Sequence, residues 1–494
     1  MNEEFISFLS DISGVSNINN VNFGDLTLDS REIIPGDCFI ALNGVKQHGL
    51  TFSRQAIKNG AKAIVYEAEG IEINDFVGET EGVLLLPVLG LKDKLAELAK
   101  KFYGNPSDKL KLIGITGTNG KTSCSHFAAE CLNQKYKSAV MGTIGNGIVG
   151  HLKQSSHTTL DIISINKMLN DFSKDDVKNV VMEVSSHGLD QGRVAELKFQ
   201  TAVFTNLTRD HLDYHKTTEN YAKCKLKLFA MKDLKNAVVN VDDPFSQTIL
   251  DHLNHQINVI VYGIKWVKTD KNYVFARDIT FEPNGMVVNF TSSWGDGVFN
   301  TKLLGDFNVS NLLAVLGILF CSGITVDKAI NYIQSVNNVA GRMEKFTANN
   351  LPKVIVDYAH TPDALEKALK TLNSHCDGKI WCVFGCGGSR DQGKRKIMGA
   401  IAEQMCDQIV LTDDNPREEQ SEKIIEDILL GMINKPMVII KQDRRQAIEY
   451  AVTNADMNDF VLVAGKGHEN YQEINGRRLP YSDREIVSNL GMLN

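Results

Sequence analysis

Short apolar runs alternate along most of the chain with stretches in which apolar residues recur at helical spacing. These runs are KLIGIT, NVVMEVS, TAVFTNL, NAVVNV and NVIVYGI before residue 265, and KVIVDYA, KIWCVFG, DQIVLTDD, MVIIKQD and DFVLVAGKG after residue 352. Buried strands that alternate with helices predict a parallel sheet wrapped by helices. The chain is therefore predicted to be an α/β protein with two open parallel sheets.

The first part of the chain has the same character on a smaller scale. It contains the β-like runs DCFIAL, AKAIVYE and GVLLLPV, with turn residues such as those at 35–37 between them. The stretch LKDKLAELAKKF then has helical spacing, and Gly104-Asn105-Pro106 is a strong stop signal after it. We expect this helix to bridge two domains.

These patterns predict three domains, because 494 residues are too many for one core. They are a small α/β N-terminal domain over 1–88, a central parallel-sheet domain over 89–340, and a C-terminal Rossmann-like α/β domain over 341–494. In the central domain, YVFARDITFEPNGMVVNF predicts a hairpin around residues 283–285 that is appended to the sheet.

Composition limits the class of protein. Hydrophobic residues make up 43% and charged residues 23% of the chain, as in an ordinary globular protein. No apolar run approaches the ~20 residues of a membrane span. The N-terminus MNEEFISFLSD is acidic and unlike a secretory signal. We expect a cytoplasmic protein that does not insert into membranes.

Cysteine usage and charge narrow the choice further. The nine cysteines are dispersed, so we expect reduced thiols that mostly pack in the core. The net charge is −7 and basic residues are spread along the chain, which argues against a nucleic-acid partner. An anionic ligand must therefore be held by local donors. We expect a monomer.

The stretch IGITGTNGKTSCS carries the clearest chemistry. Gly120-Lys121-Thr122 matches the end of the phosphate-loop pattern, but Ile115 occupies the position of its first glycine. Glycines let backbone N–H groups surround phosphate oxygens, and the following helix offers its positive N-terminus. The alternative is a glycine-rich turn with an exposed lysine. We predict a P-loop-type ATPase domain whose nucleotide contacts are Thr116, Gly117, Thr118, Asn119, Gly120, Lys121 and Thr122.

The variant GTNGKT and ten further segments resemble the Mur ligase superfamily, in that family's order from Leu26 to about Asp483. They include LTLDSREIIPGDCFIAL, EVSSHGLDQGR, NLTRDHLDYH, YAKCKLKLF, GDFNVSNLLAV, GRMEKF, DYAHTPDAL, GCGGSRDQGKR, DDNPREE and AGKGHENYQ. Together they are similar to the E-type ligases of peptidoglycan precursor synthesis.

The resemblance implies a two-step reaction. ATP phosphorylates the D-Glu side-chain carboxylate of UDP-N-acetylmuramoyl-L-Ala-D-Glu, and the amine of meso-2,6-diaminopimelate then attacks the acyl phosphate. A carboxylate is a poor electrophile, so its oxygen must first become part of a good leaving group. The protein contributes positioning and charge neutralisation.

Metal chemistry is expected at the ends of neighbouring strands. Glu183 ends one apolar run and could share Mg²⁺ with Thr122, because this hard ion prefers oxygen ligands. By resemblance, His211 binds a second Mg²⁺ and Lys225 is carbamylated, which turns a cation into an oxygen ligand. The alternative for Lys225 is a solvated basic strip with its lysine neighbours. The predicted catalytic residues are Lys121, Glu183, His211 and Lys225.

The resemblance also assigns the adenine and ribose side of ATP. Asn308 and Asn311 match the adenine-side residues, and Asn311 is preferred because an amide offers both a donor and an acceptor. Arg342 is expected to face phosphate and Asp357 the ribose. The alternative for this pair is a hinge salt bridge.

The resemblance gives the precursor contacts as well. His157 lies where many relatives have asparagine, and Leu160 replaces a common proline or glycine. Arg193 offers a planar fork for a carboxylate. The predicted contacts to the UDP portion are Leu28, Ser30, Val45, Lys46 and Gln47. Those to the muramoyl dipeptide are His157, Thr158, Thr159, Ser185, Gln191 and Arg193.

The motif DDNPR matches the diaminopimelate-adding members of the family. Diaminopimelate has a second amino-carboxylate head where lysine has only an amine, and an unpaired buried arginine would disfavour lysine. Lysine and lanthionine remain alternative acceptors, and Arg417 could instead form a surface ion pair with Glu418 or Glu419. The predicted acceptor contacts are Arg390, Asp414, Asn415, Pro416, Arg417, Gly465 and Glu469.

Three rival functions remain open. A folylpolyglutamate-synthase-like ligase would keep the ATP loop and Lys225 but would not need DDNPR or AGKGHE. A P-loop switch would explain the loop but not the arginines of the C-terminal domain. An inactive scaffold is disfavoured by the intact Lys121, Glu183, His211 and Lys225.

Overall fold

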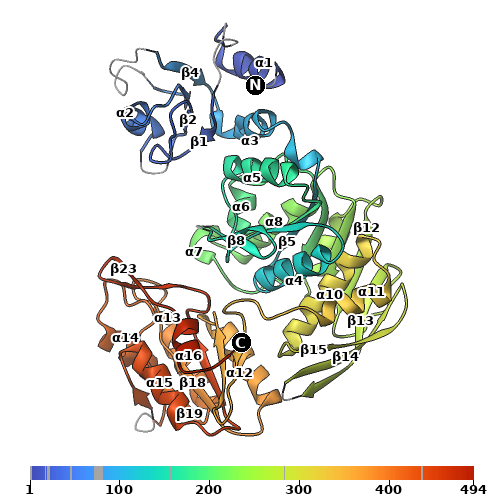
Figure 1. The fold of residues 1–494 in the computed structure, drawn as a ribbon, viewed down its shortest axis with the longest axis vertical. Coiled ribbons are helices and arrows are strands. Elements are labelled where there is room, and N and C mark those ends of the chain that lie inside the picture. The colour runs from blue at the N-terminus through green and yellow to red at the C-terminus, as the bar shows by residue number, and fades with distance from the viewer. Residues whose placement is uncertain are drawn as a thin grey trace. The chain divides into compact units, whose positions relative to one another are not determined.

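The computed structural model of the chain describes residues 3–16, 18, 23–44, 47–71, 82–155, 157–282, 284–434 and 438–493 (Figure 1). The chain divides into two compact units. The first comprises Met1–Lys121, Leu132–Val239 and Phe245–Val259, and the second comprises Thr122–Cys131, Asn240–Pro244 and Ile260–Asn494.

The N-terminal part is a parallel sheet of four strands in the order β1-β2-β3-β4. The helix predicted over LKDKLAELAKKF is confirmed with both of its ends, and the left-handed φ of 53° at Asn105 turns the chain beyond it. The elements are α1 (Glu3–Ser13), β1 (Leu26–Thr27), β2 (Cys38–Ala41), a 3₁₀ turn (Gly49–Phe52), α2 (Ser53–Lys58), β3 (Ala63–Glu67), β4 (Leu84–Val88), α3 (Leu91–Phe102) and a 3₁₀ turn (Pro106–Asp108).

The central sheet has 11 strands in the order β15-β14-β13-β12-β11-β10-β5-β9-β6-β7-β8. Its middle is parallel, and both ends finish in antiparallel hairpins. The strands are β5 (Lys111–Thr116), β6 (Ser138–Met141), β7 (Asn146–Ile148), β8 (His151–Lys153), β9 (Asn179–Glu183), β10 (Phe199–Phe204), β11 (Asn236–Asn240), β12 (Asn258–Gly263), β13 (Asn272–Glu282), β14 (Gly285–Ser292) and β15 (Gly297–Thr301). The helices are α4 (Lys121–Asn133), α5 (Ile162–Lys174), α6 (Ser186–Asp190), α7 (Leu212–His215), α8 (Thr218–Phe229), α9 (Ser246–His252), α10 (Asp306–Cys321) and α11 (Val326–Gln334).

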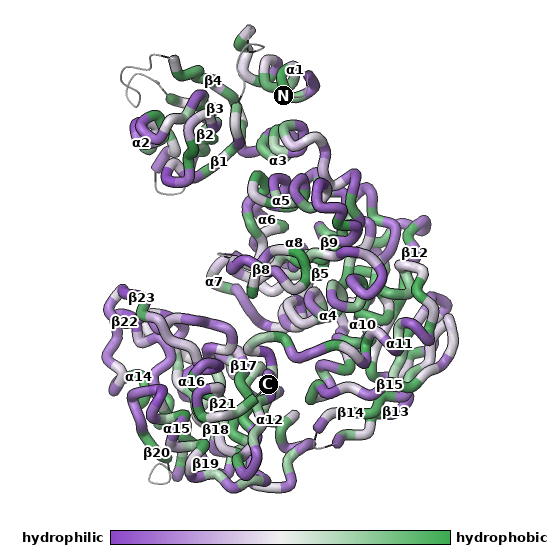
Figure 2. Tube along the Cα trace, viewed as in Figure 1, coloured by the Kyte–Doolittle hydropathy of each residue, from purple (hydrophilic) through white to green (hydrophobic). Residues whose placement is uncertain are grey.

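The C-terminal sheet has six strands in the order β16-β17-β21-β18-β19-β20, parallel except at β16, and a separate hairpin follows it. Its central strands are apolar, as their green colour in Figure 2 shows, and they are buried between helices. The elements are β16 (Glu344–Phe346), β17 (Lys353–Asp357), α12 (Pro362–His375), β18 (Ile380–Phe384), α13 (Gly393–Met405), β19 (Gln408–Leu411), α14 (Ser421–Leu429), β20 (Ile439–Ile440), α15 (Arg444–Asn454), β21 (Phe460–Ala464), β22 (Tyr471–Ile474), β23 (Arg477–Pro480) and α16 (Asp483–Asn489).

The α/β fold class and every apolar run predicted as a strand are confirmed. The hairpin of β13 and β14 is confirmed too, although Pro283 in its turn lies outside the described residues. The run MVIIKQD forms a strand of only two residues at the sheet edge. The nine cysteines are free thiols, as expected. Among the described residues, no helix has the length and apolar character to cross a membrane.

Candidate active site

Three parallel strands bring the predicted catalytic segments to one edge of the central sheet. β5 lies between β9 and β10, with Ile115 paired to Glu183 and Thr116 paired to Phe204. The carboxyl ends of these strands are therefore adjacent, which is where open α/β sheets bind ligands. The phosphate loop follows β5, and the segment leading to His211 follows β10.

The phosphate loop lies tightly against the end of β10. Its Gly117 has a φ of 153°, and a Cβ atom there would lie 1.8 Å from the Thr205 hydroxyl oxygen. The Thr118 N–H donates to the Asn206 carbonyl at 2.8 Å. The Lys121 ammonium donates to the carbonyl oxygens of Gly117 and Thr118 at 2.9 and 2.8 Å. Lys121 begins α4, so the predicted order of strand, glycine loop, lysine and helix is confirmed.

Glu183 is fully buried, and its carboxylate is held by donors of a residue that sequence reasoning missed. The Thr143 N–H donates to Oε1 at 2.7 Å and the Thr143 hydroxyl donates to Oε2 at 3.1 Å. Gly142 permits this approach, because a Cβ atom there would lie 2.1 Å from Oε1. Thr143 lies outside the motifs on which the sequence prediction rests, which is why it was overlooked.

The predicted dipeptide contacts form one hydrogen-bonded network around Glu183. The Thr143 and Thr158 hydroxyl oxygens lie 3.1 Å apart, and the Thr159 hydroxyl donates to the Glu183 carbonyl at 2.9 Å. Arg193 Nη1 donates to the Thr159 carbonyl at 2.7 Å. The same network contains Ser185, which bonds Thr159, and Gln191, whose amide oxygen accepts from Arg193.

His157, by contrast, is exposed and its backbone N–H donates to the Ser155 hydroxyl. The planar fork of Arg193 is occupied by the Gln191 amide, with Nε and Nη2 at 2.9 and 2.6 Å from Oε1. The structure therefore brings Thr158, Thr159 and Arg193 together and leaves His157 at the surface.

Lys225 lies on the buried face of α8 and is 1% exposed, whereas Lys223 and Lys227 are exposed. The alternative interpretation of Lys225, as part of a solvated basic strip, is therefore wrong. Its ammonium lies 4.3 Å from the centroid of the Tyr221 ring. Burial lowers the pKa of Lys225 well below its usual value, and the positive charge of Lys121 acts in the same direction.

His211 precedes α7 with a left-handed φ of 53°. Its ring lies 4.8 Å from that of His187, and its Nε2 is 3.4 Å from an Asp210 carboxylate oxygen. Burial lowers the pKa of His211, and the nearby charges of Lys121 and Lys225 lower it further, while Asp210 raises it. Within the described part of the chain, no three His, Cys, Asp or Glu side chains form a ready cage for a metal ion.

In the second unit, the predicted adenine-side residues are buried on α10. Asn311 Nδ2 donates to Asn308 Oδ1 at 3.1 Å, and the Cys124 thiol donates to Asn311 Oδ1 at 3.3 Å. The two asparagines are therefore brought together, although much of their hydrogen-bonding capacity is used within the protein.

Arg342 and Asp357 each have a defined neighbour in that unit. Arg342 Nη2 donates to the Thr122 hydroxyl at 3.4 Å, and its guanidinium lies 4.7 Å from the centroid of the Tyr358 ring. The Asp357 carboxylate accepts the Met343 N–H at 2.7 Å. Burial raises the pKa of Asp357, and the charge of Arg342 opposes this shift.

Three of the predicted UDP contacts, Leu28, Ser30 and Gln47, lie in loops of the N-terminal part. Ser30 is buried and its hydroxyl donates to the Gln55 amide oxygen at 2.8 Å, while Leu28 is half-buried just after β1. Gln47 is exposed, in a loop closed by the bridge between residues 43 and 48. Val45 and Lys46 lie outside the described residues.

The predicted acceptor residues gather beyond the ends of β19 and β21. Asn415 Nδ2 donates to Glu469 Oε2 at 3.1 Å. Lys466, a fully buried residue that the prediction did not include, donates to Asn415 Oδ1 at 3.1 Å and to Glu469 Oε2 at 2.9 Å. Gly465 has a φ of 120°, and a Cβ atom there would lie 3.5 Å from an oxygen of Asp414.

Arg417 does form an ion pair, but its partner is neither of the expected neighbours. Its Nε lies 3.0 Å from Glu473 Oε2 on β22, and Glu419 pairs instead with Arg395. Pro416 precedes it, and its carbonyl oxygen would lie 1.9 Å from a Cβ atom on Gly388. Arg390 is exposed in the neighbouring loop after β18.

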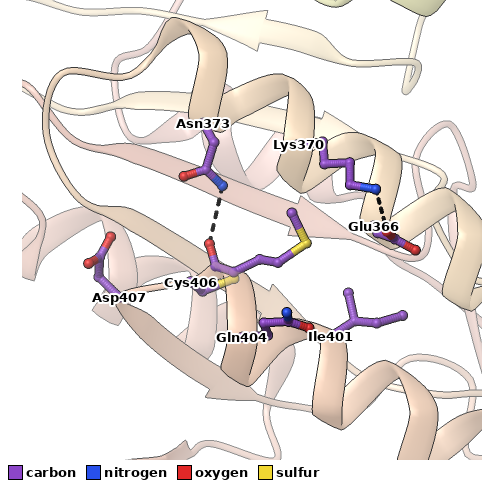
Figure 3. Close-up of a pocket in the computed structure, with 8 residues that line it drawn as sticks. Glu366, Lys370, Asn373, Ile401, Gln404, Cys406 and Asp407 are labelled. Atoms are coloured by element: carbon purple, nitrogen blue, oxygen red, sulfur yellow. Dashed lines mark hydrogen bonds and ion pairs between the residues drawn. The ribbon is translucent and has the colours of Figure 1, made fainter.

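A polar cavity of about 660 Å³ lies elsewhere on the C-terminal sheet, between α12 and α13 (Figure 3). Asn373 donates to the Met405 carbonyl at 3.3 Å across it, and Lys370 pairs with Glu366. None of the site residues predicted from the sequence lines this cavity.

Comparison with known proteins agrees with this arrangement. Three family models match: "Mur ligase family, catalytic domain" over residues 23–103, "Mur ligase middle domain" over 115–319, and "Mur ligase, glutamate ligase domain" over 341–467.

Curated relatives named UDP-N-acetylmuramoyl-L-alanyl-D-glutamate–2,6-diaminopimelate ligase are similar over most of their length. The protein of Coxiella burnetii is 47% identical over 93% of this chain and 94% of its own, and that of Pseudomonas syringae pv. tomato is 42% identical over 93% of each. A solved structure with the same name is 35% identical, covers 97% of this chain and 98% of its own, and has a TM-score of 0.68. The chain therefore belongs to the Mur ligase family, and its resemblance to the E-type members is confirmed.

Proposed function

We propose that the chain is an ATP-dependent ligase that adds meso-2,6-diaminopimelate to the D-Glu of UDP-N-acetylmuramoyl-L-Ala-D-Glu through an acyl phosphate. The observation that supports this most is the 47% identity, over 93% of the chain, to a relative named for that reaction. We also propose domains at 1–88, 89–340 and 341–494; the matches over 115–319 and 341–467 fall within the second and third of these, and the match over 23–103 runs beyond the first. The proposal assigns the reaction to the cytoplasm.

The residues at the edge of the central sheet suit phosphoryl transfer. The backbone N–H groups of the phosphate loop and the N-terminus of α4 would bind the phosphates of ATP, and Lys121 would neutralise their charge. The network that includes Thr159 and Arg193 would hold the peptide acid beside the loop. Positioning of this kind lowers the barrier without covalent chemistry by the protein.

The donor set fits Mg²⁺, which supplies charge neutralisation for the phosphoryl group when bound. Thr122 offers a hydroxyl and His211 a ring nitrogen. Glu183 offers a carboxylate whose orientation is fixed by Thr143. These residues, with Lys225 once it is carbamylated, are the proposed ligands.

Carbamylation of Lys225 is part of the proposal because a buried cation suits a metal site poorly. No carboxylate among the described residues lies within ion-pair distance of its ammonium. The lowered pKa favours the neutral amine, which can attack the carbon of CO₂. A new N–C bond forms, the nitrogen releases one proton, and a carbamate with oxygen ligands results.

For the acceptor we propose that Arg417, with Arg390, receives the distal carboxylate of diaminopimelate. Glu469 would receive the distal ammonium, since its Oε2 is already held by Asn415 and Lys466 and its Oε1 points to no described partner. Asp414, Pro416 and Gly465 would complete the walls of this subsite.

The test is a coupled assay of ADP release with the purified chain, Mg²⁺, ATP and the dipeptide precursor. Meso-diaminopimelate, lysine and lanthionine are compared as acceptors, and the product is weighed by mass spectrometry. We expect ADP and tripeptide to form together, with diaminopimelate preferred. ADP release without tripeptide would contradict a ligase, and preference for lysine or lanthionine would contradict the assigned acceptor.

A further inference from the structure

The β22–β23 hairpin holds the backbone of the DDNPR loop. The Arg417 N–H donates to the Glu473 carbonyl at 2.9 Å, and the Asn475 N–H donates to the Arg417 carbonyl at 2.8 Å. The Gln472 amide donates to the Asp414 carbonyl at 2.9 Å. These bonds keep Arg417 at a left-handed φ of 53°, a conformation that arginine rarely adopts. The hairpin therefore determines where the Arg417 side chain starts.

The side chain of Glu473 then fixes the Arg417 guanidinium. Nε lies 3.0 Å from Glu473 Oε2, and Nη1 donates to the Gly388 carbonyl at 2.9 Å. Nη2 has no partner among the residues that the structure describes. The side chains are 20% and 25% exposed, so the pair is only partly screened by water. Two of the three nitrogens are occupied, and the third remains for a ligand.

The same hairpin residue orients the neighbouring amide. The Glu473 N–H donates to Asn415 Oδ1 at 2.9 Å, and Lys466 also donates to that oxygen. Asn415 Nδ2 uses one of its two hydrogens to bind Glu469, so one hydrogen remains for the head group of the incoming amino acid. Asn415 therefore links the hairpin to Glu469 through hydrogen bonds on both sides of its amide.

We propose that Glu473 is a positioning residue for acceptor specificity. Its carboxylate holds Arg417 so that Nη2 meets the distal carboxylate of a two-headed amino acid. This inference rests on the proposed function and deepens it. A guanidinium already fixed on two nitrogens loses little rotamer freedom when it binds, so the preference for an acceptor with a distal carboxylate is built in before binding.

The test is the variant Glu473→Ala, which removes the carboxylate but keeps both backbone hydrogen bonds of residue 473. A hydrogen bond to a charged group is lost, so we expect the KM for diaminopimelate to rise about tenfold or more. The kcat and the KM for ATP should stay within about twofold of wild type. Lanthionine should behave like diaminopimelate. The reaction with lysine should be unaffected. It is measured by the turnover of lysine or by its inhibition of the diaminopimelate reaction.

Three further comparisons separate the position of Arg417 from charge and from folding. Glu473→Gln retains an oxygen that accepts from Nε, so its KM for diaminopimelate should stay within about threefold of wild type. Glu418 is exposed, follows Arg417 in the chain and forms no ion pair with it. Glu418→Ala removes the same charge and should leave kcat and the KM values for diaminopimelate and ATP unchanged. In the Arg417→Ala background, Glu473→Ala should have no further effect on KM.

Each outcome separates this inference from the proposed function. If wild type forms no tripeptide with diaminopimelate, the proposed function fails. If wild type is active and Glu473→Ala keeps the wild-type KM, only the role of Glu473 is contradicted. A merely structural role of Glu473 would lower the activity with lysine and with diaminopimelate equally, raise the KM for ATP, or strongly lower the melting temperature. Any of these results would overturn the inference.

Discussion

The Lys225 ammonium lies 4.3 Å from the centroid of the Tyr221 ring, and the Tyr221 hydroxyl lies 3.1 Å from the Thr118 hydroxyl of the phosphate loop. One aromatic side chain thus contacts both the lysine proposed to become a carbamate and the loop proposed to bind ATP. Because Tyr221 is buried, this link is sheltered from water. The contacts of Tyr221 therefore set the distance between α8 and the phosphate loop.

The variant Lys225→Ala should lose ligase activity by at least about a hundredfold, because an oxygen ligand for Mg²⁺ would be missing. Short carboxylates such as acetate should restore part of the activity by filling the space with oxygen atoms. The measurement is tripeptide formation with and without added acetate. Lys223→Ala, on the exposed face of the same helix, is the control and should remain active. Full activity of Lys225→Ala would remove Lys225 from the mechanism.

Replacing Gly117 by alanine should abolish tight ATP binding. The new Cβ atom would lie 1.8 Å from the Thr205 hydroxyl oxygen, so the loop must move away from β10. We expect the KM for ATP to rise about tenfold or more, as measured by ADP release. Gly150→Ala is a matched control, since Gly150 has a φ of 91° but nothing within 4 Å of its Cβ position. A normal KM for ATP in Gly117→Ala would show that the loop tolerates the shift.

Removing the Thr143 hydroxyl should disturb Glu183. Thr143→Ala removes one hydrogen bond to the buried Glu183 carboxylate, which should lower the free energy of unfolding by about 1–3 kcal/mol. The Mg²⁺ concentration for half-maximal activity should rise, because the carboxylate is less firmly oriented. Urea unfolding and a Mg²⁺ titration measure the two effects. Thr143→Ser retains the hydroxyl and should be close to wild type; equal loss in both variants would contradict this role.

Stability should fall as the pH drops below neutral. Burial lowers the pKa of His126 and of His468 from 6.5 to about 4. Between these values the unfolded chain binds protons that the native protein does not, so the free energy of unfolding decreases with decreasing pH. Each histidine contributes about 1 kcal/mol per pH unit in this window.

The variant His126→Leu isolates one of these contributions. Its free energy of unfolding, measured in urea at pH 7 and pH 5, should change less between the two values than that of wild type. His252→Leu, at an exposed position of α9, serves as the control and should keep the wild-type dependence. An unchanged dependence in His126→Leu would contradict a buried neutral imidazole.

Much of the fold follows from local patterns. The apolar runs became the parallel strands because such strands are buried on both faces, and α3 ends at its predicted C-terminus because Gly104 and Asn105 turn the chain. The strands of the β22–β23 hairpin were not predicted, since YQEI and RRLP have no apolar run. The edge hairpin β7–β8 was missed for the same reason.

The site was predictable where a motif carried it and not where distant segments meet. Lys121 and Glu183 follow from a loop pattern and a strand end. The bond of Glu183 to Thr143 spans 40 residues and that of Arg417 to Glu473 spans 56, so no local pattern announces them. The alternative interpretation of Arg417, an ion pair with Glu418 or Glu419, rested on sequence proximity alone, whereas Arg417 pairs with Glu473 on the hairpin.

The proposed acceptor residues lie in the loops after β18, β19 and β21 of the C-terminal sheet, whereas Lys121, Glu183 and Lys225 belong to the central sheet and its helices. If these proposed roles hold, choice of the incoming amino acid and activation of the acid are encoded in separate stretches of the gene. A few substitutions in the loops after β18, β19 and β21 could retune which building block enters the cell wall. The acceptor could thus change in evolution while the residues proposed to activate the acid stay the same.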